Sequence, residues 1–405
     1  RAAHEQPRSR RQFQVGRWVS RMRGLPEVRG ELPVSILAEE ILEPGPGKLR
    51  AMVTIAGNPV LSTPHSDRLD SALGSLEFMV AVDLYLNETS RHADVILPGV
   101  SPLRRPHYDF AFNQLSVRNI ANYSPAMLPL PAGDLDEWQV LLRLGAVVSG
   151  QGADADLDAL DDAVFGSMVG SATAGTGSPI QGRSPEGIFE ATDGGRGPER
   201  MLDFMLRTGP YGDGYGANGT GLTLARMREA PHGIDLGPLQ PRFPADLCTP
   251  SGRVELAPET LLADVPRLET AVVREINGGL LLIGRRHIRS NNSWMHNIDV
   301  LVQGRARCTL QMHPGDAERI GVSDDDTVKV SSSVGALVAL VEVTSEIMPG
   351  VVSLPHGWGH DLEGAELSVA SARPGVNSNR LSTGEMDPLS GNAILNGVPV
   401  EVMPA

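Results

Sequence analysis

The stretch from Leu280 to Asn297, LLLIGRRHIRSNNSWMHN, constrains the fold more than any other part of this sequence. It opens with a short apolar run, Leu280 to Ile283, which has the length of a buried strand and is ended by Gly284. The residues that follow are too polar and too rich in hydrogen-bond donors to pack inward. Such a loop suits a large ligand with phosphates and a polar heterocycle, because arginine pairs with phosphate bidentately. A solvated basic loop is the alternative.

Composition and charge exclude several classes of protein. The 405 residues are enough for two or three domains, and 41% of them are apolar. The net charge of −14, from 49 acidic and 35 basic residues, argues against a nucleic-acid partner. No apolar run is long enough for a membrane span. The two cysteines, Cys248 and Cys308, cannot supply a disulfide framework or iron–sulfur ligands, so we expect a reducing, cytoplasmic location.

An α/β pattern follows an arginine-rich N-terminal arm that ends in a predicted helix, Leu32 to Leu42. Leu49 to Ala56 is a predicted buried strand with a glycine turn at its end. Asp67 to Leu76 is a predicted amphipathic helix, and Phe78 to Val82 and Val95 to Leu97 are further predicted strands. Polar residues follow the strand ends. This layout predicts a doubly wound sheet, whose ligands bind beyond the carboxyl ends of the strands.

The middle of the chain is predicted to be helical and then irregular. Helices are expected over Asp136 to Val148, Asp154 to Val169 and Pro198 to Arg207. The glycine-rich region 170–221 contains a GxGxxG match. No strand precedes this match and no helix begins at its third glycine, Gly219, so it is not a dinucleotide fingerprint.

From Gly279 onward the pattern is rich in strands, and the break between the two patterns falls near residues 265–278. A compact β-barrel is the economical interpretation. Its predicted elements are a helix over His313 to Ile320 and strands over Asp326 to Ser332, Ala336 to Thr344, Val351 to Leu354 and Val398 to Met403.

Six stretches, in order, resemble the molybdopterin oxidoreductases that carry two molybdopterin guanine dinucleotides, the group of formate dehydrogenases, nitrate reductases and dimethyl sulfoxide reductase. They are AGNPVLSTP (56–64), VDLYLNETSRHADVILP (82–98), TPSGRVEL (249–256), IGRRHIRSNNSWMHN (283–297), HPGDAERIGVSDDDTVKVSSSVG (313–335) and GVNSNRL (375–381). Each stretch alone is a weak signal, and six in the expected order are a strong one.

The resemblance implies a fold of class α/β plus β that forms only the C-terminal half of such an enzyme. The family's N-terminal half, with the protein ligand of the metal, is not within these residues. The implied domains are an arm and helix that contact the missing half (1–48), a Rossmann-like nucleotide-binding domain (49–150), an irregular and helical connection (151–278) and a double-psi β-barrel that binds the molybdopterin dinucleotide (279–405).

Several positions carry chemistry that suits this ligand. Gly57 would let the backbone approach a phosphate, and Asn58 offers both a donor and an acceptor. The Asp83 carboxylate could accept from both N–H groups of guanine, or else cap a helix or turn. Thr89 could hydrogen-bond a phosphate or ribose, or cap its turn. His356 and His360 have the spacing of two metal ligands, but the glycines between them disfavour a helix, so this segment is predicted as a loop on the cofactor side.

The resemblance extends the expected cofactor-binding set along the donor-rich loop and toward the C-terminus. No catalytic residue or metal ligand is predicted within these residues. The full set is Gly57, Asn58, Pro59, Asp83, Thr89, Gly284, Arg285, Arg286, Asn291, Asn292, Ser293, Trp294, His296, His356, Trp358, Asn377 and Asn379.

The function implied is a two-electron oxidation of a small substrate at molybdenum or tungsten, with formate dehydrogenase-like chemistry preferred over assimilatory nitrate reductase-like chemistry. The expected cofactors are two molybdopterin guanine dinucleotides, and an iron–sulfur cluster only if the missing half supplies it. Expected partners are that half or a separate subunit, a small substrate and an electron-transfer protein. A non-catalytic scaffold without molybdenum is the rival interpretation, and this chain alone is expected to be inactive.

Overall fold

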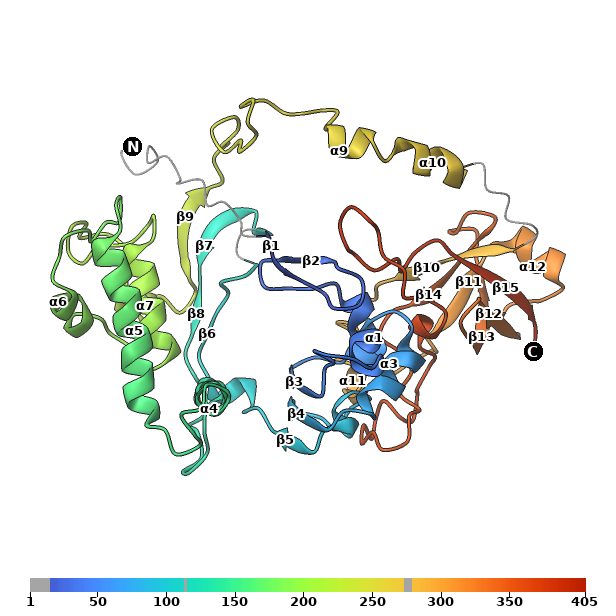
Figure 1. The fold of residues 1–405 in the computed structure, drawn as a ribbon, viewed down its shortest axis with the longest axis horizontal. Coiled ribbons are helices and arrows are strands. Elements are labelled where there is room, and N and C mark those ends of the chain that lie inside the picture. The colour runs from blue at the N-terminus through green and yellow to red at the C-terminus, as the bar shows by residue number, and fades with distance from the viewer. Residues whose placement is uncertain (1–14, 113–114, 273–278) are drawn as a thin grey trace. The chain divides into compact units, whose positions relative to one another are not determined.

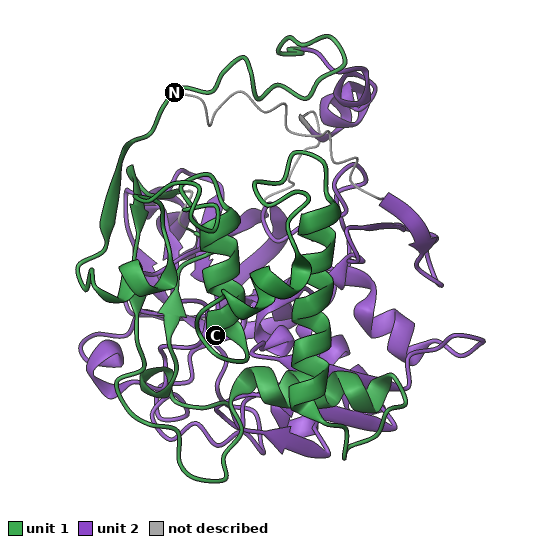
Figure 2. Ribbon diagram, turned by 90° about the vertical axis from the view of Figure 1, so that its left-hand side faces the viewer, with its two compact units in different colours: residues 1–11, 99–256 green, residues 12–98, 257–405 purple. Residues whose placement is uncertain are grey.

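The structure is a computed structural model that describes residues 15–112, 115–272 and 279–405 (Figure 1). Contacts within the chain divide it into two compact units, coloured separately in Figure 2. The described part of unit 1 is residues 99–112 and 115–256, and that of unit 2 is residues 15–98, 257–272 and 279–405. The predicted domain ranges stay predictions, and the described parts of 49–98 and 279–405 lie in the same unit.

A closed six-stranded barrel forms the C-terminal part of unit 2. Its strand order is β10-β14-β11-β13-β12-β15, and the barrel's first and last strands in chain order are neighbours, with Leu280 opposite Val400. The pairs β10/β14 and β11/β13 are parallel. The strands are β10 (Leu280–Arg285), β11 (Thr309–Met312), β12 (Thr327–Ser331), β13 (Ala336–Val343), β14 (Val351–Pro355) and β15 (Val398–Pro404), with helices α11 (Asp299–Val302) and α12 (Pro314–Ile320) between them.

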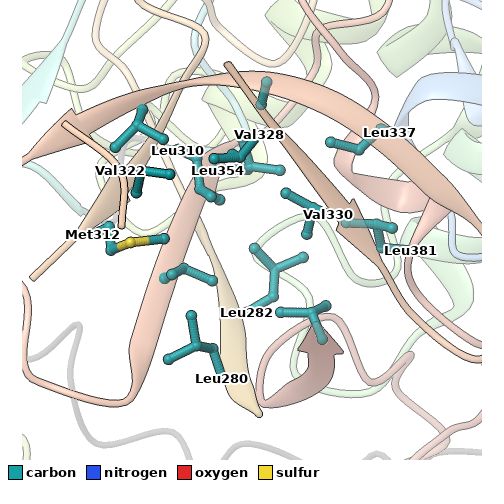
Figure 3. Packing of buried hydrophobic residues seen from close by; sticks show 14 of the residues in the cluster. Leu280, Leu282, Leu310, Met312, Val322, Val328, Val330, Leu337, Leu354 and Leu381 are labelled. Atoms are coloured by element: carbon teal, nitrogen blue, oxygen red, sulfur yellow. The ribbon is translucent and has the colours of Figure 1, made fainter. Parts of the chain in front are cut away.

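Alternation along the strands fills the barrel with aliphatic side chains. Along β13, Leu337, Ala339 and Val341 are buried, while Val338 and Leu340 between them are exposed. Leu310, Val328, Val330, Leu354 and other members of the cluster meet inside (Figure 3). Closing the barrel pairs every strand on both sides, which removes exposed strand edges.

A three-stranded parallel sheet, in the order β3 (Ala51–Ile55), β4 (Phe78–Val82) and β5 (Val95–Leu97), lies in the same unit. Met79 on one face packs against Ile41, Leu69 and Leu73 from the helices α1 (Leu37–Leu42) and α3 (Ser66–Leu73). Pro59–Ser62 forms the short helix α2 directly beyond β3.

The other face of this sheet is apolar, and it is exposed along β3 and at the start of β4 and β5, whereas Val80 and Val82 on β4 are buried. The register places Val53 beside Val80 and Val95, and Ala51 beside Phe78. Val53 is 48% exposed and Phe78 is 47% exposed. Parallel sheets are normally covered on both faces.

The N-terminal arm is folded where it is described. β1 (Val15–Val19) and β2 (Pro26–Val28) form an antiparallel hairpin, followed by the 3-10 helix η2 (Val34–Ile36) and then α1. Ion pairs join Arg21 to Glu40 and Arg23 to Glu39, so buried carboxylates of α1 hold the hairpin.

Unit 1 combines helices with two small sheets. Its strands are β6 (His107–Tyr108), β7 (Arg118–Ala121), β8 (Tyr123–Ser124) and β9 (Ile234–Pro238), paired β6/β8 and β7/β9. Its helices are α4 (Glu137–Val148), α5 (Leu157–Ala174), α6 (Pro185–Glu190), α7 (Pro198–Thr208) and α8 (Leu224–Arg228), with the 3-10 helix η4 (Pro102–Arg104).

The remaining elements belong to unit 2. They are the 3-10 helices η3 (Ser90–His92) and η6 (Ser378–Arg380) and the helices α9 (Glu259–Leu262) and α10 (Val265–Val272).

Two local predictions were wrong. The strand expected to end at Gly284 continues through Arg285, because Arg285 pairs with Pro355 and the Gly284 N–H donates to the Asn396 side chain. The backbone turn assigned to Gly57 is made by Ala56, which has a φ of 49°. The α/β and barrel parts are confirmed, whereas the doubly wound and double-psi assignments stay predictions.

Candidate functional site

Three loops of the barrel meet a turn of the parallel sheet within unit 2. The loops are residues 286–298 after β10, 356–360 after β14 and 374–381 near the C-terminus, and the turn is residues 83–90 after β4. Their contact is very close. A Cβ added to Gly357 would collide with the Asn292 carbonyl oxygen, and one added to Gly375 would lie 2.8 Å from the Trp358 ring. Both glycines also have positive φ, so no other residue fits these positions without strain.

A line of hydrogen-bonded ionisable side chains crosses this junction. Glu88 Oε1 lies 2.8 Å from His360 Nδ1, and His360 Nε2 lies 2.8 Å from His296 Nδ1. Glu88 is 0% exposed, and both histidines are 1% exposed. The Trp358 ring stacks on His296, with ring centroids 3.9 Å apart. Burial and the charge of His360 lower the pKa of His296 to about 3.

The strand-end residues complete the same network on the sheet side. Asn58 Nδ2 donates to Glu88 Oε2 at 2.7 Å, and Thr89 Oγ1 donates to Asn58 Oδ1 at 2.7 Å. The Val60 N–H in turn donates to Thr89 Oγ1. Burial alone would raise the pKa of Glu88, but its bonds to His360 and Asn58 hold that pKa below the ordinary value. Glu88 is therefore a buried carboxylate kept ionised by its donors.

Two nitrogen atoms of this cluster have no hydrogen-bond partner. They are Nε2 of His296 and Nε1 of Trp358, both buried. Buried polar atoms in folded proteins are nearly always paired, so such atoms point to a ligand or to ordered water. Within the described ranges, no three or more His, Cys, Asp or Glu side chains are arranged to hold a metal ion.

Asn377 and Asn379 serve the contact between barrel and sheet. Asn377 Nδ2 donates to the Val60 carbonyl at 3.0 Å, and Asn379 Nδ2 donates to the Leu61 carbonyl at 2.8 Å. Both side chains are buried. Their amide donors thus satisfy carbonyls of α2, the helix that begins at Pro59.

Arg285 also has a clear structural task. Its guanidinium donates to the Thr309 carbonyl at 2.8 Å, to Thr309 Oγ1 at 2.9 Å and to the Ser353 carbonyl, which ties β10 to β11 and β14. Burial lowers its pKa. The neighbouring Arg286 is exposed and bonds to the Asn292 side chain.

The remaining predicted residues line the surface of the same junction or its strand ends. The Asp83 carboxylate accepts from the Leu84 N–H at 2.7 Å and from Asn87 Nδ2 at 2.9 Å, so it caps its own turn. Gly57, Gly284, Asn291, Asn292, Ser293, Trp294 and His356 are exposed or half-buried, and Trp294 is 52% exposed.

Sequence reasoning missed the two side chains at the centre of the network. Glu88 belongs to no recognisable motif of its own in the sequence, and His360 was assigned only to a loop on the cofactor side. They are 272 positions apart in the chain, and no local pattern links them. Asp94, in the same quoted stretch as Glu88, has a structural contact, because its carboxylate accepts from the Met79 N–H at 2.8 Å.

Comparison with protein families identifies the barrel region. A family model described as "Molydopterin dinucleotide binding domain" matches residues 280–399. The assimilatory nitrate reductase catalytic subunit of Bacillus subtilis is 30% identical over 120 residues, which are 29% of this chain and 16% of that protein. The F420-dependent formate dehydrogenase 1 subunit alpha of Methanococcus maripaludis is 22% identical over 324 residues, which are 80% of this chain and 40% of that protein.

The fold is shared with a solved structure, acetylene hydratase from Pelobacter acetylenicus. The TM-score is 0.59 at 17% identity, over 94% of this chain and 47% of that one. The chain therefore spans less than half the length of each of these three proteins. No helix within the described ranges has the length and apolar character needed to cross a membrane.

Proposed function

We propose that this chain, which belongs to the molybdopterin oxidoreductase family, is the C-terminal cofactor-binding portion of a bis-molybdopterin guanine dinucleotide enzyme that oxidises a small substrate by two electrons. The observation that carries the proposal is the pair of buried, unpartnered nitrogens on His296 and Trp358, where three loops of the matched domain meet. A polar ring edge entering there would satisfy both atoms.

The residues proposed to hold the cofactor follow from these contacts. His296 and Trp358 would bond its polar ring edge, and Arg286, which is exposed, would pair with phosphate. Arg285 is a weaker candidate, because its guanidinium already bonds to carbonyls of the barrel. When bound, the cofactor would supply a molybdenum or tungsten centre that exchanges two electrons. The protein binds and orients that centre.

The Asp83→Asn variant tests the assignment of guanine to the tip of β4. Oδ1 of the Asp83 carboxylate accepts from the N–H groups of Leu84 and Tyr85, whereas Oδ2 accepts only from Asn87 Nδ2 and could still accept from an N–H group of guanine. We expect the variant to retain less GMP, released by acid from purified protein, than wild type does. Asp361→Asn, at an exposed position, is the control. Equal GMP content in Asp83→Asn and wild type would remove this assignment.

We propose further that the active enzyme requires additional polypeptide, either in the same chain or as a partner subunit. Two observations support this: the relatives are more than twice as long as the segment matched, and the Val53 face of the parallel sheet is exposed and apolar. The additional polypeptide would supply the metal's protein ligand and the route to an electron acceptor. With only two cysteines, neither in a disulfide, the proposed location remains the cytoplasm.

Formate dehydrogenase-like chemistry is the first choice, because the similarity to that relative covers 80% of this chain. Nitrate reduction is the second candidate, favoured by the higher identity, 30%, to the nitrate reductase over a shorter segment. Metal analysis and acid release of GMP from the longest native polypeptide containing this sequence test the proposal. About one molybdenum or tungsten and two GMP per chain would support it, and turnover of formate or nitrate would then decide between the two. A protein with neither metal nor GMP would favour a non-catalytic scaffold.

A further inference from the structure

The hydrogen bonds that join Glu88, His360 and His296 determine which ring nitrogen of each histidine carries a proton. They leave one ring nitrogen, Nε2 of His296, without a partner. The ionised Glu88 carboxylate can only accept, so the proton on His360 is held at Nδ1. If His360 is neutral, its Nε2 is an acceptor, and His296 must donate from Nδ1. His296 Nε2 then carries a lone pair and faces no partner.

Adding one proton at His296 Nε2 moves another proton from His296 to His360. An N–H bond forms at Nε2, the Nδ1–H bond of His296 breaks, and its proton crosses the 2.8 Å hydrogen bond to His360 Nε2. His296 remains neutral in its other tautomer, whereas His360 becomes a cation next to the Glu88 carboxylate. No electrons are exchanged. The unpartnered atom changes from an acceptor to a donor, and the new charge comes to rest beside its counter-ion.

We propose that Glu88, His360 and His296 form a proton store, in which His296 Nε2 takes up a proton from the cofactor pocket and Glu88 holds the resulting charge on His360. This inference rests on the proposed function and deepens it. Oxidation of a C–H bond in a small substrate by two electrons releases a proton, and that proton needs an acceptor. Glu88 and His360 are positioning residues that act through His296.

The groups around the line favour one stored proton and oppose a second. Burial and then the charge of His360 lower the pKa of His296, and His287 and His356 add smaller effects in the same direction. A hydrogen bond with the Gly357 backbone acts in the opposite direction, with an effect larger than that of either His287 or His356. At the other end, Asn58 donates to Glu88, and Arg91 Nε donates to the Glu88 carbonyl. A purely structural network would be expected to end on a satisfied atom, and this one ends on an unpartnered nitrogen.

Nitrogen-15 NMR of the histidines tests the proton store directly. The sequence has ten histidines, and long-range proton–nitrogen spectra of the 405-residue chain distinguish both neutral tautomers from the cation. Variants His296→Gln and His360→Gln assign the signals. We expect His296 to change from the Nδ1–H to the Nε2–H tautomer as the pH falls, at the same pH at which His360 becomes cationic. A His296 that keeps one tautomer, or that itself becomes the cation while His360 titrates, would overturn the proposal.

The Glu88→Gln variant tests whether the negative charge of Glu88 stabilises the cation on His360. It keeps an acceptor for His360 Nδ1 but removes the negative charge, so the midpoint of the tautomer change should fall by about 1 to 3 pH units. Glu366→Gln removes an exposed carboxylate of the same region and should leave the midpoint unchanged. An unshifted midpoint in Glu88→Gln contradicts the proposal. The wild-type experiment does not depend on whether Glu88→Gln folds.

Failure of this inference and failure of the proposed function can be told apart. The tautomers are measured without cofactor, whereas the cofactor assignment is tested by metal and GMP content. A protein that shows the tautomer change but holds no metal or GMP would support the proton store and contradict its proposed role in substrate oxidation.

Discussion

Asn379 shows how a single amide can join parts of the chain that are distant in sequence. Its Nδ2 donates to the Leu61 carbonyl, 318 positions away, and its backbone N–H is bonded by the Asn377 side chain. The residue is 4% exposed, so water cannot replace the lost donor if the amide is removed. At the scale of the residue, this side chain aligns α2 with the barrel.

We expect Asn379→Ala to lower the free energy of unfolding by about 1 to 3 kcal/mol, because it leaves a buried carbonyl without its donor. Urea unfolding followed by circular dichroism measures this. Asn392→Ala, at an exposed position of the same C-terminal region, is the matched control and should stay within about 0.5 kcal/mol of wild type. Equal stability of the two variants would mean that Asn379 has no role in this contact.

The chain after β14 contains two glycines with similar backbone conformation and different surroundings. Gly357 and Gly364 have nearly the same backbone conformation, with φ of 88° and 87°. A Cβ on Gly357 would collide with the backbone of Asn292, whereas one on Gly364 would meet only the Arg91 side chain at 3.9 Å. The pair therefore separates the cost of the left-handed backbone from the cost of the close loop contact.

Gly364→Ala should destabilise the protein by about 1 to 2 kcal/mol, the cost of a left-handed conformation with a Cβ. Gly357→Ala should cost clearly more, because the loop bearing Asn292 must move away from the loop bearing Trp358. It should also disturb the His296 tautomer signals, which Gly364→Ala should leave unchanged. Denaturant unfolding and the histidine spectra check both points, and matching losses in the two variants would refute the contact.

Elements were predictable where the pattern is local. The strands over Phe78–Val82 and Val95–Leu97 agree with the prediction to the residue, because short apolar runs between polar turns are strong signals. β11 (Thr309–Met312) was missed, since four residues that include Gln311 give too little periodicity.

The site was predictable only in part, because its contacts are not local. The sequence places His296 and Trp358 in donor-rich loops, and it offers no sign that Glu88 joins them through His360. Likewise, nothing in the sequence shows that Arg285 turns inward to the Ser353 and Thr309 carbonyls while Arg286 stays exposed. The direction of a guanidinium is decided by the register of β10 with its neighbours.

At the scale of the whole molecule, the exposed face of the parallel sheet is the feature that sets how this chain behaves in isolation. Ile55 and Val53 on β3 are 56% and 48% exposed, and Phe78 on β4 and Val95 on β5 are also exposed, although Val80 between Val53 and Val95 is buried. Exposed apolar side chains gathered in this way mark contact surfaces or cause self-association.

We expect Ile55→Lys to reduce the binding of the dye ANS and the light scattering of the 405-residue chain, because it places a charge in the patch. Val338→Lys, at an equally exposed position of the barrel, is the control and should change dye binding much less. In the longest native polypeptide, Ile55→Lys should instead lower stability or assembly. Dye binding that is the same in Ile55→Lys and wild type would show that the face is not an open patch in solution.

The strand order of the barrel has a consequence for biosynthesis. β10 begins at Leu280 and pairs with β15, whose strand ends at Pro404, so the barrel cannot close until nearly the whole of this sequence has left the ribosome. Domains generally fold in the order in which they are synthesised, and this one must wait for its last strand. The loops that carry His296 and His360 follow the barrel strands β10 and β14. The proposed ligand would therefore bind at this junction only after β15 has been synthesised, and a truncation that removes β15 should prevent its binding.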